Sequence, residues 1–168
     1  MTFTIRPEAP SDAPVIDAVV TSAFLSAPHR SGTEAAIVRA LRNAGALTLS
    51  LVAVTGGKLI GHVAASPVTI GAVSSGWYGL GPVAVLPQEQ GHGVGSRLVE
   101  QALRRLRQQG AAGCVVLGEP AYYGRFGFAV QPGMVLGGVP PGYLQALACD
   151  GATPQGAVRY HPAFEAGP

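Results

Sequence analysis

The sequence predicts a mixed α/β fold, with antiparallel strands in its first half and a parallel βαβ unit in its second. Strand-like runs at 47–55, 58–68 and 77–86 follow one another across short turns, as antiparallel neighbours do. A helical pattern at 93–109 then joins the third run to the apolar segment 113–117, and strands joined by a helical crossover lie parallel.

The N-terminal part should hold one strand and two helices. Residues 2–6 alternate as a strand does. Helices are expected from residue 11 to 24 and from 34 to 44, because Ser11 and Thr33 carry side chains that can cap a first helical turn.

The remaining segments complete a single domain spanning 1–168. Gly56-Gly57 predicts a two-residue hairpin turn between the first two antiparallel strands, and a short helix is expected near 121–126. Residues 131–168 are rich in Pro and Gly, with weak strand signals at 143–149 and 157–160. We expect these two runs to form a hairpin that completes the sheet.

The segment between the third strand and the long helix is a glycine loop with the sequence Gln90-Gly91-His92-Gly93-Val94-Gly95-Ser96. A helix N-terminus presents unpaired N–H groups and the positive end of the helix dipole. Glycines let such a backbone approach a bulky phosphate closely. A phosphorylated ligand is therefore expected here, against the simpler interpretation of a tight turn before a surface helix.

Three kinds of phosphate site compete for this loop. A Walker loop needs Lys followed by Ser or Thr after its last glycine, whereas Gly95 is followed by Ser96-Arg97. A dinucleotide fold needs its glycines directly after the strand and an acid about 20 residues on, and only Glu119 comes near that spacing. The third is the pyrophosphate loop of acyl-CoA-dependent acetyltransferases.

The loop matches the Gln/Arg-x-x-Gly-x-Gly/Ala signature and so resembles the GNAT superfamily of N-acetyltransferases, in its branch of predicted bacterial enzymes. Residues 82–87 look like that family's cofactor strand, and 121–128 resemble its Phe-Tyr-x-x-x-Gly-Phe segment. The resemblance covers 3–130 well and the tail less securely. It implies a GNAT-like fold and acetyl-CoA as co-substrate.

The resemblance also implies which residues hold acetyl-CoA. The cofactor strand would pair with the pantetheine arm through its backbone, and the loop would bind the pyrophosphate. The family's asparagine before the short helix has no counterpart here, so backbone groups near 117–118 would replace it. The implied set is Val83, Ala84, Val85, Gln90, Gly91, His92, Gly93, Val94, Gly95, Ser96, Leu117, Gly118, Tyr123 and Phe126.

Tyr123 aligns with the tyrosine that the family often places near the CoA sulfur as general acid, and packing in the core is the alternative role. The family's usual base, a glutamate on the cofactor strand, has no counterpart, because 77–86 contains no carboxylate. Candidate bases elsewhere are Glu34, Glu119, His62 and His29.

Composition limits the partners. With 48% hydrophobic residues, 12% charged residues and a net charge of +2, the chain should fold around a sizeable core and not bind nucleic acid. No membrane-length apolar run or signal-peptide pattern is visible, so a cytoplasmic protein is expected. The four histidines and two cysteines form no metal pattern.

Three functions stay open. The leading hypothesis is an acetyl-CoA-dependent N-acetyltransferase that passes acetyl to a primary amine by direct attack in a ternary complex. The missing strand carboxylate motivates a non-catalytic acetyl-CoA-binding sensor or interaction module, and a nucleotide-binding domain is the weakest alternative. The amine acceptor is unidentified, and a homodimer is considered because dimers are common in the family.

Overall fold

The computed structural model describes residues 2–25 and 32–166. The segment 26–31, which includes the candidate base His29, lies outside the described residues. The strands in chain order are β1 (Thr4–Pro7), β2 (Leu49–Thr55), β3 (Lys58–Ile70), β4 (Trp77–Val85), β5 (Gly113–Leu117), β6 (Met134–Val135), β7 (Leu144–Ala148) and β8 (Gly156–Tyr160). The helices are α1 (Ala13–Phe24), α2 (Glu34–Asn43), α3 (Val94–Gln108) and α4 (Pro120–Tyr123), with short 3₁₀ turns η1 (Pro10–Asp12), η2 (Pro87–Glu89), η3 (Gly124–Phe126) and η4 (Pro162–Glu165).

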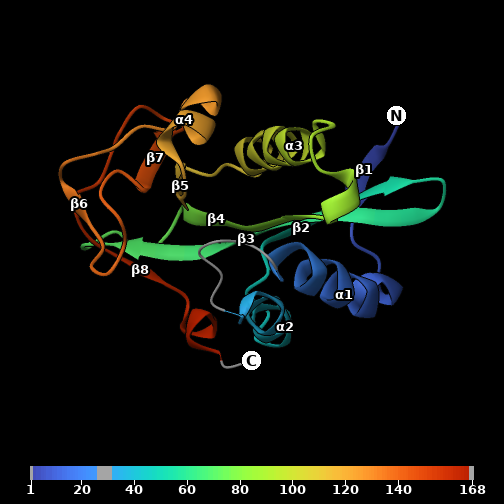
Figure 1. Cartoon of the computed structure of the whole chain (residues 1–168). Coiled ribbons are helices and arrows are strands. Elements are labelled where there is room, and N and C mark those ends of the chain that lie inside the picture. The colour runs from blue at the N-terminus through green and yellow to red at the C-terminus, as the bar shows by residue number, and fades with distance from the viewer. Residues whose placement is uncertain (1, 26–31, 167–168) are drawn as a thin grey trace.

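The strands form one mixed sheet in the order β1-β2-β3-β4-β5-β7. Helices α1 and α2 cover one face and α3 covers the other, while α4 lies beside β5 and β7 (Figure 1). The first four strands pair antiparallel, and β4 pairs parallel with β5 across the α3 crossover. The expected mixed α/β architecture is confirmed, including its parallel βαβ unit.

The β2–β3 hairpin forms as the paired glycines predict. Gly56 and Gly57 have φ angles of 54° and 78°, the left-handed conformation that a tight hairpin turn requires at both positions. Helix α3 also buries the expected apolar face, which consists of Val94, Leu98, Val99, Ala102, Leu103 and Leu106. Both predictions succeed because local pattern and tertiary packing favour the same structure.

The predicted cap position at Ser11 is wrong, whereas Thr33 is the N-cap residue of α2 as predicted. Ser11 lies within η1, and α1 starts after Asp12, whose carboxylate accepts a hydrogen bond from the Ala9 amide (2.7 Å) and is paired with Arg6. Thr33 does precede α2, but its side chain makes no capping bond to the first turn. The Asp12 side chain therefore bonds to the preceding turn and makes no capping bond to α1 either.

The predicted C-terminal hairpin is also wrong. Strands β7 and β8 both join the sheet, but they do not pair with each other: β7 pairs antiparallel with β5, and β8 pairs antiparallel with the far end of β3 and parallel with β6. The physical reason is the length of β3, whose last residues, Val68–Ile70, extend beyond its pairing with β4 and leave an edge for β8.

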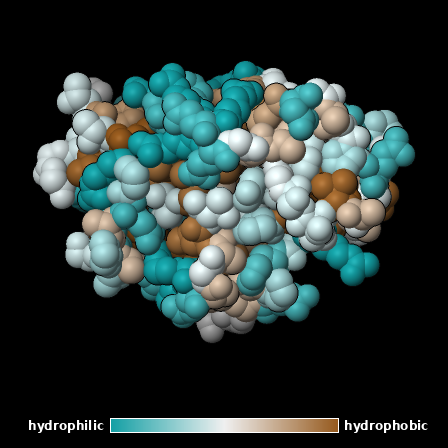
Figure 2. All heavy atoms as spheres, turned by 180° about the vertical axis from the view of Figure 1, so that it is seen from behind, coloured by the Kyte–Doolittle hydropathy of each residue, from teal (hydrophilic) through white to brown (hydrophobic). Residues whose placement is uncertain are grey.

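Apolar side chains fill both sides of the central strands. The largest buried cluster lies between the sheet, α1 and α3, and it includes Cys114 as a small buried side chain, as expected. On the face shown in Figure 2 most of the surface is hydrophilic or intermediate, and hydrophobic atoms appear only in separate patches. This distribution fits a chain that places most of its apolar residues inside.

Candidate functional site

Strands β4 and β5 pair over only part of their length. Trp77–Leu80 of β4 pair with residues 113–116 of β5, and beyond Leu80 strand β4 continues to Val85 on β3 alone. The parallel ladder is therefore open at its end, beside the glycine loop. Leu117 is the last residue of β5 at this opening.

A bulge in β4 turns its free backbone groups toward this opening. Between Leu80 and Val83, strand β4 has two residues where β3 has one. Since the Leu86 amide bonds to the Ile60 carbonyl (2.9 Å), the antiparallel alternation directs the backbone groups of Ala84 to β3 and those of Val83 and Val85 to the opening. Ala84 itself is buried on the sheet and lines no described cavity.

The glycine loop is an unpaired backbone cradle. Gly91 and Gly93 both have φ of 82°, and a Cβ on either would meet nothing within 4 Å. Within the described part of the chain, the amides from Gly91 to Ser96 have no hydrogen-bond acceptor. Gln90 bonds the Val85 carbonyl (3.2 Å) and so ties the loop to the strand.

A cavity of about 450 Å³ opens at this cradle. Its described lining residues come from the loop, from the end of β4 and from the α4 segment: Val85, Glu89, Gln90, Gly91, Gly93, Val94, Gly95, Ser96, Tyr122 and Arg125. The predicted loop residues are thus brought together, except His92, whose exposed ring has Nδ1 3.2 Å from the Glu89 carbonyl oxygen. A positive helix end, bare amides and Arg125 together suit an anion.

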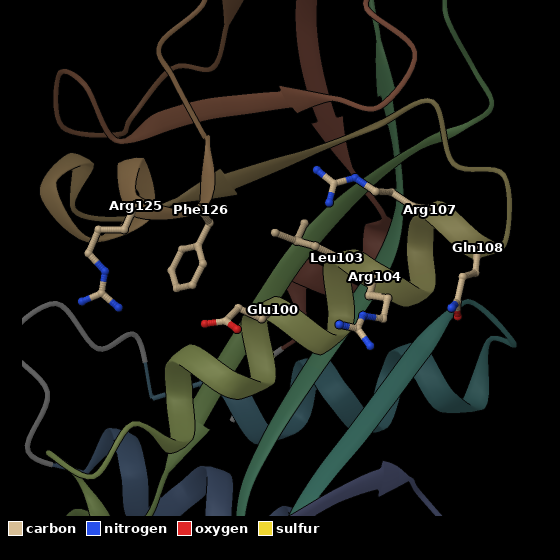
Figure 3. Close-up of a pocket in the computed structure, with 7 residues that line it drawn as sticks. All are labelled: Glu100, Leu103, Arg104, Arg107, Gln108, Arg125 and Phe126. Carbon is tan, nitrogen blue, oxygen red and sulfur yellow. The ribbon is translucent and has the colours of Figure 1, made fainter.

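A basic cavity of about 530 Å³ shares Arg125 with this cradle. Figure 3 shows Glu100, Leu103, Arg104, Arg107 and Gln108 projecting from α3, and Arg125 and Phe126 projecting from η3. Phe126, predicted to contact the cofactor, lines this cavity. Three arginines around one glutamate leave the cavity with an excess of positive charge.

A third cavity, of about 370 Å³, reaches the other face of the sheet through the opening. It brings together four predicted site residues: Glu34, Val83, Leu117 and Tyr123. The full described lining is Phe24, Glu34, Ile37, Leu80, Gly81, Pro82, Val83, Leu117, Tyr123, Tyr160 and Phe164. This cavity therefore borders β4 at residues 80–83, and the cavity at the cradle borders the same strand at Val85.

Tyr123 is held rigidly at this cavity. Its ring packs edge-on against Tyr122 and Phe128, with ring centroids 5.0 and 5.9 Å apart, and it lies against Gly118, where a Cβ would clash with the ring. Burial raises the pKa of Tyr123 to about 12, and the nearby Tyr122 adds to the rise. The phenol consequently keeps its proton at neutral pH.

Two residues predicted for the site, Gly118 and Glu119, make hydrogen bonds to the segment around β7 instead. Gly118 donates its amide to the Tyr143 carbonyl (3.1 Å), and its carbonyl accepts from Gln145 (3.0 Å), so both backbone groups are used by β7 and its flank. Glu119 accepts a hydrogen bond of 2.7 Å from the Tyr143 hydroxyl, in an exposed position, and lines none of the three cavities.

His62 is the buried end of a partly buried polar chain and lines none of the described cavities. Its Nε2 lies 2.8 Å from the Ser50 hydroxyl, which donates to Glu8 (2.5 Å), and Glu8 accepts two bonds from Arg42 (2.9 and 3.0 Å). Burial raises the pKa of Glu8, but the bonds from Arg42 and Ser50 outweigh it and bring the pKa below its usual value. Burial lowers the pKa of His62 to about 4.

The structure adds residues that sequence reasoning missed. Tyr160 and Phe164 reach the third cavity from β8 and η4, and Phe24 and Ile37 reach it from α1 and α2. No motif marks them, because they converge only through the β8–β3 pairing and the packing of η4 against α2. Arg125, by contrast, lies inside the recognised segment.

Two further structural findings are negative. Among the described residues, no group of three or more His, Cys, Asp or Glu side chains is arranged to hold a metal ion. No helix in the described ranges has both the length and the apolar character that a membrane crossing needs.

Comparison with known proteins identifies the family of this chain. The family model described as Acetyltransferase (GNAT) family matches residues 18–128. The chain belongs to the GNAT acetyltransferase family. An uncharacterized N-acetyltransferase, YhbS of Escherichia coli K12, is 40% identical over 169 residues, covering 95% of this chain and 97% of its own.

Solved GNAT structures share the fold closely. A GNAT family acetyltransferase from Brucella melitensis, solved in complex with acetyl-CoA, is 48% identical with a TM-score of 0.87, covering 97% of this chain and 98% of its own. YhbS from Escherichia coli, solved in complex with CoA, is 36% identical with a TM-score of 0.85, covering 97% and 92%. The expected family and fold class are therefore confirmed.

Proposed function

We propose that this GNAT protein is an acetyl-CoA-dependent N-acetyltransferase that passes the acetyl group to a primary amine by direct attack in a ternary complex. The observation that carries the proposal is the unpaired cradle from Gly91 to Ser96, placed where β4 and β5 separate. The Brucella melitensis and Escherichia coli relatives, which were solved with acetyl-CoA and CoA, support it.

The residues present fit the co-substrate along its whole length. Cradle amides at the α3 N-terminus would hold the pyrophosphate. The outward backbone groups of Val83 and Leu117 and the amide of Val85 would pair with the pantetheine arm, since the Val85 carbonyl already accepts a hydrogen bond from Gln90. Arg125 joins the cradle to the basic cavity, so the phosphate on the adenosine end would meet Arg104 and Arg107 there.

Acetyl-CoA supplies its acetyl group as a thioester, so a C–N bond to the amine forms as the C–S bond breaks. The amine nitrogen gives up one proton and the departing sulfur takes up one. Tyr123 lines the cavity at the opening and holds a proton at neutral pH, so we assign it as the donor to sulfur. Its phenol then regains a proton from solvent.

The amine must arrive neutral or be neutralised in the site. With a pKa near 10.4, it is almost wholly protonated at pH 7, and neutralising it costs about 4–5 kcal/mol. Strand β4 carries no carboxylate, and of the two glutamate candidates Glu34 lines the cavity whereas Glu119 does not. We therefore favour Glu34 as the base, acting through water.

The test combines binding with turnover. Calorimetric titration with acetyl-CoA should show binding, and thiol release should appear with at least one amine from a panel of peptides, polyamines, amino acids, aminoglycosides and simple alkyl or aryl amines. Binding without thiol release from any amine would favour the non-catalytic sensor. Absence of binding would refute both.

Cytoplasmic location and a homodimer remain predictions of the proposal. Cell fractionation checks the first, and light scattering of the purified protein, with and without acetyl-CoA, checks the second.

A further inference from the structure

The cavity at the cradle has little net charge on its side chains. Among the described lining residues, Arg125 and Glu89 are the two charged ones, and their charges are opposite. A diphosphate placed here must therefore be held by oriented hydrogen-bond donors more than by an excess of positive charge. The bare amides at the α3 N-terminus supply one set of such donors.

Tyr122 brings a side-chain hydroxyl to the same cavity from α4. Its Oη lies 3.4 Å from Ser96 Oγ, and a Cβ on Gly95 would lie 3.4 Å from the same oxygen. The phenol oxygen is therefore placed against the first turn of α3, beside the amides of Gly95 and Ser96. Tyr122 is partly exposed where it lines the cavity.

This hydroxyl keeps donor capacity for a ligand. The separation of 3.4 Å from Ser96 Oγ is its only hydrogen bond within the described residues, and it is longer than the usual hydroxyl bond of about 2.7–2.8 Å. Ser96 Oγ already accepts a bond of 2.7 Å from Arg125. The hydroxyl protons of Tyr122 and Ser96 can consequently both turn toward an anion in the cavity.

The packing of the Tyr122 ring does not require a hydroxyl. The Arg125 guanidinium lies 4.9 Å from the ring centroid, and the rings of Tyr123 and Phe126 have centroids 5.0 and 5.4 Å away. A phenylalanine would keep all three contacts. In the Phe-Tyr-x-x-x-Gly-Phe pattern that residues 122–128 resemble, the position of Tyr122 is indeed a phenylalanine. Packing therefore explains the ring and leaves the hydroxyl unexplained.

We propose that the Tyr122 hydroxyl donates a hydrogen bond to the diphosphate of acetyl-CoA, and so adds a side-chain donor from α4 to the backbone donors of the cradle. This inference rests on the proposed acetyltransferase function. It gives the two adjacent tyrosines different roles, because Tyr122 binds the co-substrate whereas Tyr123 protonates the sulfur. A hydrogen bond to an ionised acceptor is about twice as strong as one between neutral groups, so its loss should be measurable.

The first experiment measures affinity. Acetyl-CoA is titrated calorimetrically into the wild type, Tyr122→Phe and the control Tyr143→Phe, whose hydroxyl bonds to Glu119 and which lines none of the three cavities. Tyr122→Phe should bind acetyl-CoA about tenfold more weakly, equivalent to about 1.4 kcal/mol. Tyr143→Phe should bind it as the wild type does. Equal affinities of the wild type and Tyr122→Phe, or an equal loss in Tyr143→Phe, would refute the inference.

The second experiment identifies the phosphate that the hydroxyl contacts. Phosphorus NMR spectra of bound CoA are compared between the wild type and Tyr122→Phe at saturating CoA. The diphosphate signals should differ between the two complexes, and the signal of the 3′-phosphate should not. A difference confined to the 3′-phosphate, or no difference at all, would overturn the assignment to the diphosphate.

A purely structural Tyr122 would give a different pattern. Tyr122→Phe would then change the melting temperature of the ligand-free protein and leave the diphosphate signals in place. Under the proposal the melting temperature should stay close to that of the wild type, because the three ring contacts remain. If the wild type itself bound no acetyl-CoA, the proposed function would fail, which is distinguishable from a hydroxyl without effect.

Discussion

Arg125 Nη2 donates a hydrogen bond of 2.7 Å to the Ser96 hydroxyl, and this bond ties the turn after α4 to the first turn of α3. The same guanidinium lies 4.9 Å from the centroid of the Tyr122 ring, so stacking holds it as well. Arg125 is thereby held between the cradle and the basic cavity, where it can face phosphate groups on both sides.

Replacing Arg125 should weaken acetyl-CoA binding more than it slows the acetyl-transfer step. Arg125→Ala is expected to reduce acetyl-CoA affinity about tenfold, because a charge-assisted contact to phosphate contributes about 1.5–3 kcal/mol and solvent offsets part of it. The rate at saturating acetyl-CoA should change little. Calorimetry at low and high salt checks this, since screening should shrink the difference. Arg105→Ala, on α3 outside the cavities, is the control, and an equal loss there would count against a specific contact.

The glycine cradle can be tested with a matched pair of glycines. Gly93 and Gly110 have φ of 82° and 85°, and a Cβ on either would meet nothing within 4 Å. Alanine at each position should therefore cost a similar 1–2 kcal/mol of folding stability through backbone strain alone. Only Gly93→Ala should also lower acetyl-CoA affinity, by about tenfold or more, because it alone shifts the amides at the α3 N-terminus. Equal affinities for the two variants would exclude the cradle as the anion site.

The parts of the candidate site that are adjacent in sequence could be predicted from the local pattern of residues. The loop 90–96 and the end of β4 adjoin along the chain, so the order of strand, glycines and helix was enough to place them. The bulge that turns Val83 and Val85 outward was not predictable, because it arises from the register of β4 against β3.

The third cavity, by contrast, depends on long-range packing. Tyr160 and Phe164 come from a tail whose strand β8 pairs with the extended end of β3, and not with β7 as expected. The pairing partner of a strand depends on which sheet edge remains free. The local pattern of residues 157–160 does not indicate that this edge is the end of β3. The same limit applies to Glu34 and Glu119, which look alike in sequence but differ in that only Glu34 reaches the cavity.

Tyr123→Phe tests the assigned proton donor. The variant should lower kcat by about 10²–10⁴-fold, the usual contribution of general acid catalysis, while acetyl-CoA affinity stays close to that of the wild type. Because the pKa of Tyr123 is raised to about 12 by burial, its ionisation should not shape the pH–rate profile between pH 6 and about 10. Steady-state rates across that range provide the check. A wild-type-like kcat would leave Tyr123 as a packing residue.

The two glutamates give opposite expectations. Glu34→Gln should lower the rate at neutral pH and lose less at high pH, where more of the amine is already neutral and the need for a base falls. Glu119→Gln should change the rate little, since its carboxylate faces Tyr143 outside the cavities. Rate against pH for both variants with one shared amine decides between them. The reverse pattern would assign the base to Glu119.

The buried imidazole of His62, at the end of this polar chain, should make stability depend on pH. Ser50 gives its one proton to Glu8, so His62 Nε2 must donate to Ser50, and Nδ1 is left without a partner among the described residues. Burial lowers the pKa of His62 to about 4, against 6.5 in the unfolded chain. Between these values the unfolded state binds a proton that the native state does not, so stability falls as pH drops. The loss should reach about 3 kcal/mol by pH 4, at about 1.4 kcal/mol for each unit of the pKa difference.

Urea unfolding at several pH values tests this with a matched variant. His62→Gln keeps an N–H donor for Ser50 but cannot titrate, so it should be less stable than the wild type at pH 7 and show a much flatter slope between pH 6.5 and 4. His92→Gln removes an exposed imidazole and should keep the wild-type slope. Further loss below pH 4 should persist in both variants, because the lowered pKa values of Glu8 and Asp12 make their ion pairs fail there. An unchanged slope in His62→Gln would show that another group carries the acid sensitivity.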